Sequence, residues 1–115
     1  MEEVFEEVED IVDAHDTVLF GRGQGPEMQL GIDILTYLAM PPHVVDLTDQ
    51  PDLERMVLAS SRGVSLPVIF VNGQFFSGVF YLIDGVKAGQ VGPALDRLGA
   101  DYDKDALEAL RALNQ

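Results

Sequence analysis

The sequence predicts an α/β fold in which helices flank a four-stranded mixed β-sheet. Its 115 residues are enough for one domain with a hydrophobic core and too few for two. Helix and strand patterns alternate in the first half of the chain, as in a βαβ unit with two parallel strands. Two later strands are joined only by Asn72 and Gly73, a pair that favours an antiparallel hairpin. Together these units give a mixed sheet with helices on both faces.

The first 42 residues contain the patterns of a helix, a strand and a second helix. The leading helix, expected over 1–15, has apolar residues at helical spacing and acidic residues elsewhere; the apolar ones are Val4, Phe5, Val8, Ile11 and Val12. The stretch TVLF at 17–20 predicts a buried strand, and the three glycines of 21–25 predict a loop. Pro26 suits the first turn of the next helix, which the prolines at 41–42 should end.

The middle of the chain supplies the other three strands. HVVDL at 43–47 predicts the second strand, and Thr48 or Asp49 can cap a third helix after it. The unbroken apolar run VIFV at 68–71 predicts a strand that is buried on both faces. Residues 74–78 should return beside it, and strand alternation then places the two phenylalanines of this segment on opposite faces of the sheet.

Three further helices are expected near the C-terminus. They cover about 80–88, the stretch 92–99 and the amphipathic segment 101–113. The aspartates of DYDKD copy the start of a calcium-binding loop, but alanines stand where that loop needs its glycine and glutamate. A capped final helix explains these aspartates better. The apolar face of that helix carries Leu107, Leu110 and Leu113.

The chain is strongly acidic, with 20 acidic residues against 7 basic ones and a formal net charge of −13. Such a surface repels phosphate backbones, which argues against nucleic-acid binding. The charge fits simple solubility, including in a salty cytoplasm, and it also fits a basic partner. The acidic start MEEVFEEVED differs from a secretory signal, and no apolar run approaches the roughly 18 residues of a membrane span. We therefore expect a soluble cytoplasmic protein without membrane contact.

The residue types needed for several kinds of chemistry are missing. The chain has no cysteine, which excludes disulfides, thiolate catalysis and cysteine-ligated metal sites. Its two histidines, His15 and His43, are far apart in the sequence, and His15 suits the C-terminal end of the leading helix. GRGQGP, followed by Asp46, suggests a dinucleotide-binding loop, but Pro26 replaces the third glycine of that motif. The sequence predicts no catalytic residue, metal ligand or cofactor.

Three stretches, spread over about residues 8–98, resemble the monothiol glutaredoxin family. VEDIVDAHDTVLFGRGQGPEM resembles that family's leading helix, first strand and lysine–glycine–x–proline loop. VVDLTDQPDLERMV resembles its second strand and the helix after it, and SLPVIFVNGQFFSG resembles its cis-proline, strand, hairpin and glycine pair. The resemblance implies a thioredoxin-like fold and a single domain over 1–115. Its parts are a leading helix at 1–15, a core at 16–98 and a C-terminal helical extension at 99–115.

The resemblance also implies a ligand groove. Pro67 matches the family's cis-proline, and Leu66 before it matches the residue whose backbone binds a peptide or glutathione. Arg22 stands where the family has a lysine that pairs with a glutathione carboxylate, and Ser77-Gly78 stands near the glycine pair. These matches imply a cis Leu66–Pro67 bond and weak binding of a glutathione-like ligand.

The residues that perform the family's chemistry do not carry over. The cysteine–glycine–phenylalanine–serine site falls near PEMQLGID, which is about two residues shorter and contains no Ser or Thr as an alternative nucleophile. The family's aspartate for the glutathione amino group falls near Phe80, and its tryptophan falls near Gly63. With Met28, Leu30 and Leu66 also around the site, the groove is expected to be apolar.

Two functions of different classes follow from these residues. The first is a redox-inactive glutaredoxin-like domain that acts as a protein-interaction or assembly module. A protein partner or a second copy of the chain would dock in the former thiol groove, with Phe80 as its aromatic anchor unless that ring folds inward and plugs the groove. The second is a small-ligand binder that holds glutathione or a related acidic peptide through Arg22 and the backbone at Leu66.

Overall fold

The computed structural model describes residues 2–114, and the side chains of residues 6–114. The two ends of the predicted domain, Met1 and Gln115, and the side chains of Val4 and Phe5 therefore lie outside the described residues. Within this range, one sheet has the strand order β2-β1-β3-β4. The strands are β1 (Thr17–Gly21), β2 (His43–Asp46), β3 (Val68–Val71) and β4 (Gln74–Gly78).

The sheet is mixed, as the sequence predicted. Strand β1 pairs in parallel with β2 and antiparallel with β3, and β3 pairs antiparallel with β4. Both predicted buried strands, β1 and β3, are buried along their whole length. Strand β2 is largely exposed because it lies at an edge of the sheet.

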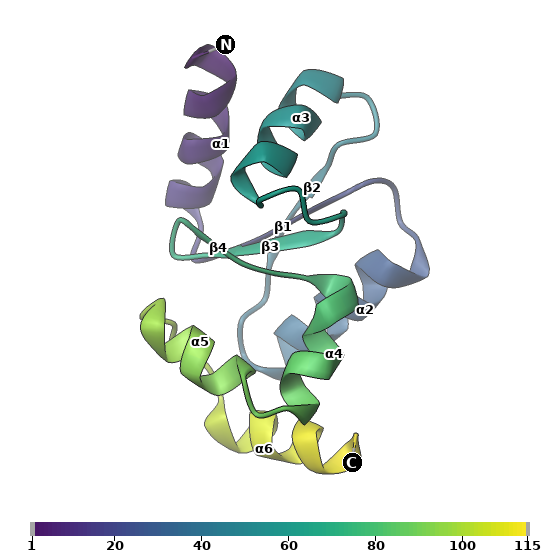
Figure 1. Ribbon diagram of the computed structural model, residues 1–115, viewed down its shortest axis with the longest axis vertical. Helices are drawn as coiled ribbons and strands as arrows, with labels where there is room; N and C mark the ends of the chain where they lie inside the picture. Colours follow the sequence, from purple (N-terminus) through teal and green to yellow (C-terminus); the bar gives the residue numbers. More distant parts are fainter. Residues whose placement is uncertain (1, 115) are drawn as a thin grey trace.

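Helices cover both faces of the sheet (Figure 1). Helices α1 and α3 lie side by side on one face, and α2 and α4 lie on the other. Helices α5 and α6 pack beyond α4, at the end of the molecule away from α1. The helices are α1 (Glu2–Ala14), α2 (Pro26–Tyr37), α3 (Pro51–Ser60), α4 (Val79–Lys87), α5 (Val91–Arg97) and α6 (Lys104–Leu113). None of these helices is long and apolar enough to cross a membrane.

The sheet separates two hydrophobic clusters. Alternate residues of β1 point to opposite faces, so Phe20 packs under α1 and α3 whereas Leu19 packs under α2 and α4. Both side chains are fully buried. The same alternation places Phe75 with the first of these clusters and Phe76 with the second, which confirms the prediction for that strand.

The turn between β3 and β4 also agrees with the sequence. Asn72 has a φ of 50° and Gly73 has a φ of 81°, both in the left-handed region that a type I′ turn requires. Asparagine and glycine tolerate this region better than other residues do. The turn is held further by the Asn72 side-chain amide, which donates a hydrogen bond of 2.8 Å to the carbonyl of Leu98.

One predicted helix cap is confirmed and the other is wrong. Asp103 caps α6, because its carboxylate accepts a 2.9 Å hydrogen bond from the amide of Ala106. The predicted cap of α3 by Thr48 or Asp49 is wrong. Gln50 occupies the cap position of α3 without a side-chain hydrogen bond, and the Thr48 hydroxyl is already used by Asp46.

The apolar face of α6 packs only in part. Leu107 and Leu110 lie against the cluster under α2 and α4, whereas Leu113 is 80% exposed. Leu113 is the last residue of the helix, so the apolar face predicted from the sequence packs on the core at its first two leucines and not at the third.

The two histidines meet, although they are far apart in the sequence. His15 directly follows α1 and stacks on His43, the first residue of β2, with ring centroids 3.8 Å apart and ring planes 8° apart. The sequence predicted that His15 lies at the C-terminal end of the leading helix, but it did not predict this stacking contact. Among the described residues, no group of three or more histidine, aspartate or glutamate side chains is arranged to hold a metal ion.

Gly31 is required for the close packing of α2 against the sheet and α4. A Cβ atom at this position would lie 2.9 Å from Cγ2 of Val79 and 3.3 Å from Cδ2 of Leu19. We expect Gly31→Ala to lower the free energy of unfolding by about 1–3 kcal/mol, because the packed neighbours must move. Urea unfolding would measure this loss. Thr36→Ala, at an exposed position in the same helix, should stay within about 0.5 kcal/mol of the wild type.

Candidate functional site

A groove of about 420 Å³ opens beside the carboxyl end of β1. The loop after β1, the start of α2, α3, the segment before β3 and the start of α4 surround it. These elements meet at one edge of the sheet (Figure 1). The lining residues are Arg22, Gly25, Glu27, Met28, Glu54, Leu58, Ser65, Leu66, Pro67 and Phe80.

The fold brings five of the residues predicted for the groove together. Arg22 follows β1, Met28 lies in the first turn of α2, Leu66 and Pro67 precede β3, and Phe80 lies in the first turn of α4. The Leu66–Pro67 bond is cis, as predicted. Phe80 is 55% exposed. Its ring is therefore at the mouth of the groove, and the alternative in which it folds inward as a plug is wrong.

The other two predicted residues do not line the groove. Leu30 is two positions beyond Met28 on α2, about 200° around the helix, and it is exposed elsewhere. Gly78 is buried at the cap position of α4. A Cβ there would lie 2.7 Å from Cγ1 of Val64, so Gly78 lets α4 begin close to the turn that precedes β3.

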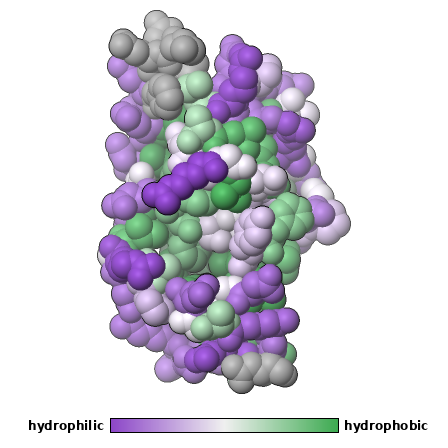
Figure 2. Space-filling view, in the orientation of Figure 1, coloured by the Kyte–Doolittle hydropathy of each residue, from purple (hydrophilic) through white to green (hydrophobic). Residues whose placement is uncertain are grey.

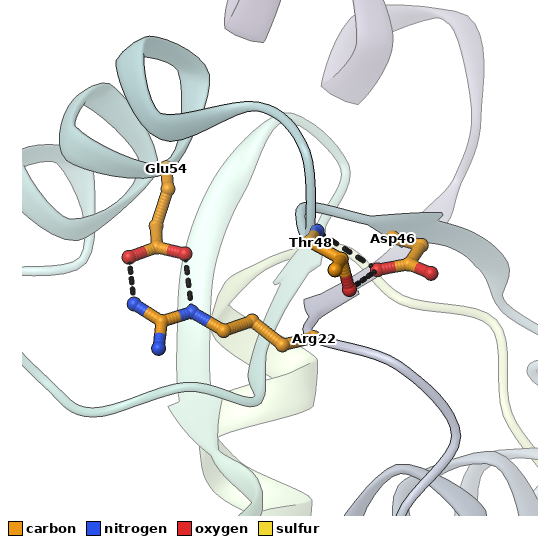
Figure 3. A network of polar contacts seen from close by, with 4 residues as sticks. All are labelled: Arg22, Asp46, Thr48 and Glu54. Atoms are coloured by element: carbon orange, nitrogen blue, oxygen red, sulfur yellow. Dashed lines mark hydrogen bonds and ion pairs between the residues drawn. The ribbon is translucent and has the colours of Figure 1, made fainter.

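Arg22 is paired with an acidic residue of the groove wall. Its guanidinium donates from Nε and Nη2 to the two carboxylate oxygens of Glu54 on α3, as Figure 3 shows. The Arg22 side chain is 64% exposed and that of Glu54 is only 13% exposed. The hydrogen bonds from Arg22 lower the pKa of Glu54, and those to Glu54 raise the pKa of Arg22. Both groups are therefore charged at neutral pH and neutralise each other.

Asp46 holds the loop that carries Arg22. Its carboxylate Oδ1, at the end of β2, accepts hydrogen bonds from the amide of Thr48 (2.9 Å) and from the Thr48 hydroxyl (Figure 3). The same oxygen accepts a hydrogen bond of 3.0 Å from the amide of Gly23. The carboxyl ends of parallel strands lie at the same edge of a sheet, so Asp46 after β2 reaches the loop after β1. This residue, considered above in a dinucleotide motif, positions the groove wall.

The hydrogen bonds to Asp46 make its contribution to stability depend on pH. The Thr48 hydroxyl, followed by the amides of Gly23 and Thr48, lowers the pKa of Asp46 below its ordinary value of about 3.9. A group with a lowered pKa in the folded state stabilises the protein above its unfolded pKa, and this stabilisation is lost as pH falls through the folded pKa.

We therefore expect Asp46→Asn to be less stable than the wild type at pH 6, and this difference to shrink as the pH falls from about 4 towards 2. Urea unfolding at a series of pH values would measure it. Asp49→Asn is the control, because no hydrogen bond involves the Asp49 side chain among the described residues. A constant difference between wild type and Asp46→Asn at all pH values would contradict the role given to the carboxylate.

Met28 is the sulfur-containing residue among those that line the groove. Its side chain is 3% exposed and packs so closely on β1 that a Cβ at Gly21 would lie 2.1 Å from the sulfur. A thioether has no proton to lose and cannot act as the thiolate that exchange with a disulfide requires. Within the described residues, the groove has the shape of a binding site and holds no nucleophile paired with a base.

Sequence reasoning missed half of the lining, above all Glu27 and Glu54. Glu54 lies in the first turn of α3, where an acid is expected for the helix dipole alone. The strand order could have indicated that Glu54 lies in the groove. Helix α3 follows β2, and β2 lies parallel to β1, so the first turn of α3 lies beside the loop after β1. That neighbourhood pairs a basic residue after β1 with an acidic residue early in α3.

A curated plant protein has a related sequence. The chain is 26% identical over 92 residues to the chloroplastic monothiol glutaredoxin-S7 of rice, Oryza sativa subsp. japonica; the match takes in 76% of this chain and 55% of that protein. The chain is a glutaredoxin homologue without a cysteine. This homologue spans about half the length of its rice relative. No protein-family model matches it.

Solved glutaredoxin structures share the fold of this homologue. Reduced apo GrxS14 from poplar superposes with a TM-score of 0.72 at 22% identity, over 84% of this chain and 93% of that one. A buckwheat glutaredoxin–glutathione complex superposes with a TM-score of 0.70 at 16% identity, over 86% of this chain and 93% of that one. The expected thioredoxin-like fold, with a four-stranded mixed sheet, is thereby confirmed.

Proposed function

We propose that this glutaredoxin homologue is a redox-inactive protein-interaction or assembly module, and that its partner docks in the groove beside β1. The partner is another protein or a second copy of the chain. The observation that supports this proposal most is the groove itself: it is open, it has an apolar floor, and Phe80 stands exposed at its mouth. An exposed aromatic ring beside an apolar pocket is the usual form of an interface anchor.

The surroundings of the groove support the same proposal. Met28, Leu58, Leu66 and Pro67 give it apolar walls. Figure 2 shows that hydrophobic and hydrophilic side chains are mixed in the middle of the view, whereas its lower end is mainly hydrophilic. An apolar patch on a chain with a net charge of −13 is exposed at a cost unless something covers it. A docked protein segment would cover it.

The second candidate function is binding of glutathione or a related acidic peptide. It is favoured by Arg22 at the position of the family's carboxylate-binding lysine, and by the buckwheat glutaredoxin of the same fold, which was solved as a glutathione complex. The charges of the groove argue against it. Glu54 already forms an ion pair with Arg22, and Glu27 adds a second carboxylate to the lining.

We expect glutathione to bind with a dissociation constant weaker than about 1 mM. Phe80 cannot accept a hydrogen bond from its ammonium group, and the loss of one charge-assisted bond costs about 1.5–3 kcal/mol, or one to two decades of affinity. Isothermal calorimetry of the full chain against reduced glutathione measures this. Micromolar binding would make the small-ligand function the better one.

The test of the interaction function compares two surface variants in affinity capture from native cytosol and in sedimentation equilibrium. Wild-type chain should retain a specific protein or associate with itself, and Phe80→Asp should not. Tyr81→Asp is a matched control, because Tyr81 is 63% exposed, is adjacent on α4 and does not line the groove. Equal behaviour of all three proteins would overturn the proposed docking site.

A further inference from the structure

We propose that the groove selects a basic protein segment with an apolar anchor residue, and that it disfavours anionic peptides. This inference rests on the proposed function and adds the chemistry of the partner to it. It starts from the ionised groups that the fold places around the groove, whose charge balance the sequence alone does not reveal.

The groove lining carries one basic and two acidic side chains. Arg22 and Glu54 form an ion pair, so the charge of Arg22 is cancelled within the wall. Glu27 remains, and among the described residues it takes part in no ion pair. Its carboxylate lies beside Gly25, where a Cβ would be 3.2 Å from Oε2. The lining therefore has a net charge of −1 at neutral pH.

A further carboxylate lies next to the groove wall. Asp46 accepts a hydrogen bond from the amide of Gly23, one residue after Arg22, and its lowered pKa keeps it ionised at neutral pH. The molecule as a whole is also acidic, with 7 basic residues against 20 acidic ones. An incoming anion meets repulsion from the wall and from the molecule as a whole, whereas a cation is attracted by both.

The apolar floor adds the requirement for an anchor. The space of about 420 Å³ lies within the range of ordinary ligand pockets, about 300–1,000 Å³. Leu58, Leu66 and Pro67 are uncharged, so they cannot form an ion pair with a lysine that enters the groove. A lysine alone therefore gains little binding energy there. An aromatic or aliphatic side chain that packs against Phe80, flanked by a lysine or arginine that faces Glu27, satisfies both the apolar floor and the acidic lining of the groove.

Three capped synthetic peptides test this inference: Lys-Lys-Phe-Lys-Lys, Glu-Glu-Phe-Glu-Glu and Lys-Lys-Ala-Lys-Lys. Each is titrated into the ¹⁵N-labelled full chain and followed by amide chemical shifts. The basic phenylalanine peptide should shift the amides of Arg22, Leu66 and Phe80. It should bind at least tenfold more tightly than either of the other two, and its affinity should fall as the salt concentration rises.

A pair of charge variants separates the groove from the acidic surface in general. Glu27→Gln should weaken binding of the basic phenylalanine peptide about two- to fivefold, the usual effect of one exposed ion pair. Glu108→Gln, which makes the same change in net charge on α6, should leave the affinity unchanged. Equal weakening by both variants would show non-specific attraction and overturn the inference.

The remaining outcomes distinguish the inference from the function on which it rests. If the acidic phenylalanine peptide shifts the groove amides with equal or higher affinity, the inference is wrong and the docking groove stands. If no peptide shifts these amides and Phe80→Asp still associates as the wild type does, both are wrong.

Discussion

Replacing Phe80 with aspartate should abolish partner capture or self-association and leave the melting temperature nearly unchanged. The ring is 55% exposed, so the new carboxylate remains in water and the fold loses little packing. Binding should suffer much more, because truncation of an aromatic anchor commonly costs at least about 2 kcal/mol, or roughly 30-fold in affinity. A charge placed at an apolar interface adds a desolvation cost to this loss.

Two measurements decide this prediction. Differential scanning calorimetry gives the melting temperatures of wild type, Phe80→Asp and Tyr81→Asp, and sedimentation equilibrium with affinity capture gives their association. The expected pattern is three similar melting temperatures with loss of association in Phe80→Asp alone. A loss of several kcal/mol in the stability of Phe80→Asp would mean that the ring is buried in solution. Normal melting together with normal association would remove Phe80 from the proposed interface.

The sequence predicted the fold well because the decisive signals are local. The run at 68–71 has no polar residue and becomes the buried strand β3, and Asn72-Gly73 supplies the positive φ angles of the hairpin turn. Pro26 and Pro51 stand at the start of α2 and α3, as the restricted φ of proline favours. The error at the cap of α3 came from competition: Thr48 can bond to a helix amide or to Asp46, and the sequence does not state which it prefers.

The candidate site was predicted less completely because its charges depend on contacts between distant segments. Arg22 and Glu54 are 32 positions apart, and their pairing requires the parallel placement of β1 and β2. The stack of His15 on His43 arises from the same placement, since each residue adjoins one of these two strands. The prediction that Leu30 lines the groove was wrong for a local reason. Leu30 is two positions beyond Met28 on the helix, so its side chain points to the other side of α2.

The groove of this structure depends on the packing of the core and not on a thiol. Its walls are also parts of the core: Pro67 and Met28 are buried, and Gly21 is fitted to the Met28 sulfur. Removing the groove would require repacking β1 and α2. Changing what it binds requires only changes in the lining, and we expect two lining residues, Glu54 and Phe80, to oppose a glutathione-like ligand. The binding preference is therefore separable from the fold.

The last prediction uses this separation to restore glutathione binding. In Glu54→Gln with Phe80→Asp, the glutamine releases Arg22 to pair with a carboxylate, and the aspartate replaces the one that the glutaredoxin resemblance implies for the ammonium group. Each restored charge-assisted bond contributes about 1.5–3 kcal/mol, so the double variant should bind glutathione at least a hundredfold more tightly than the wild type. Calorimetry with reduced glutathione would measure the gain. Adding Arg22→Gln should remove most of it and leave the melting temperature close to that of the double variant, because the Arg22 side chain is largely exposed. A double variant that binds no better than the wild type would show that the lost thiol, or the shortened segment before α2, and not these two side chains, prevents glutathione binding.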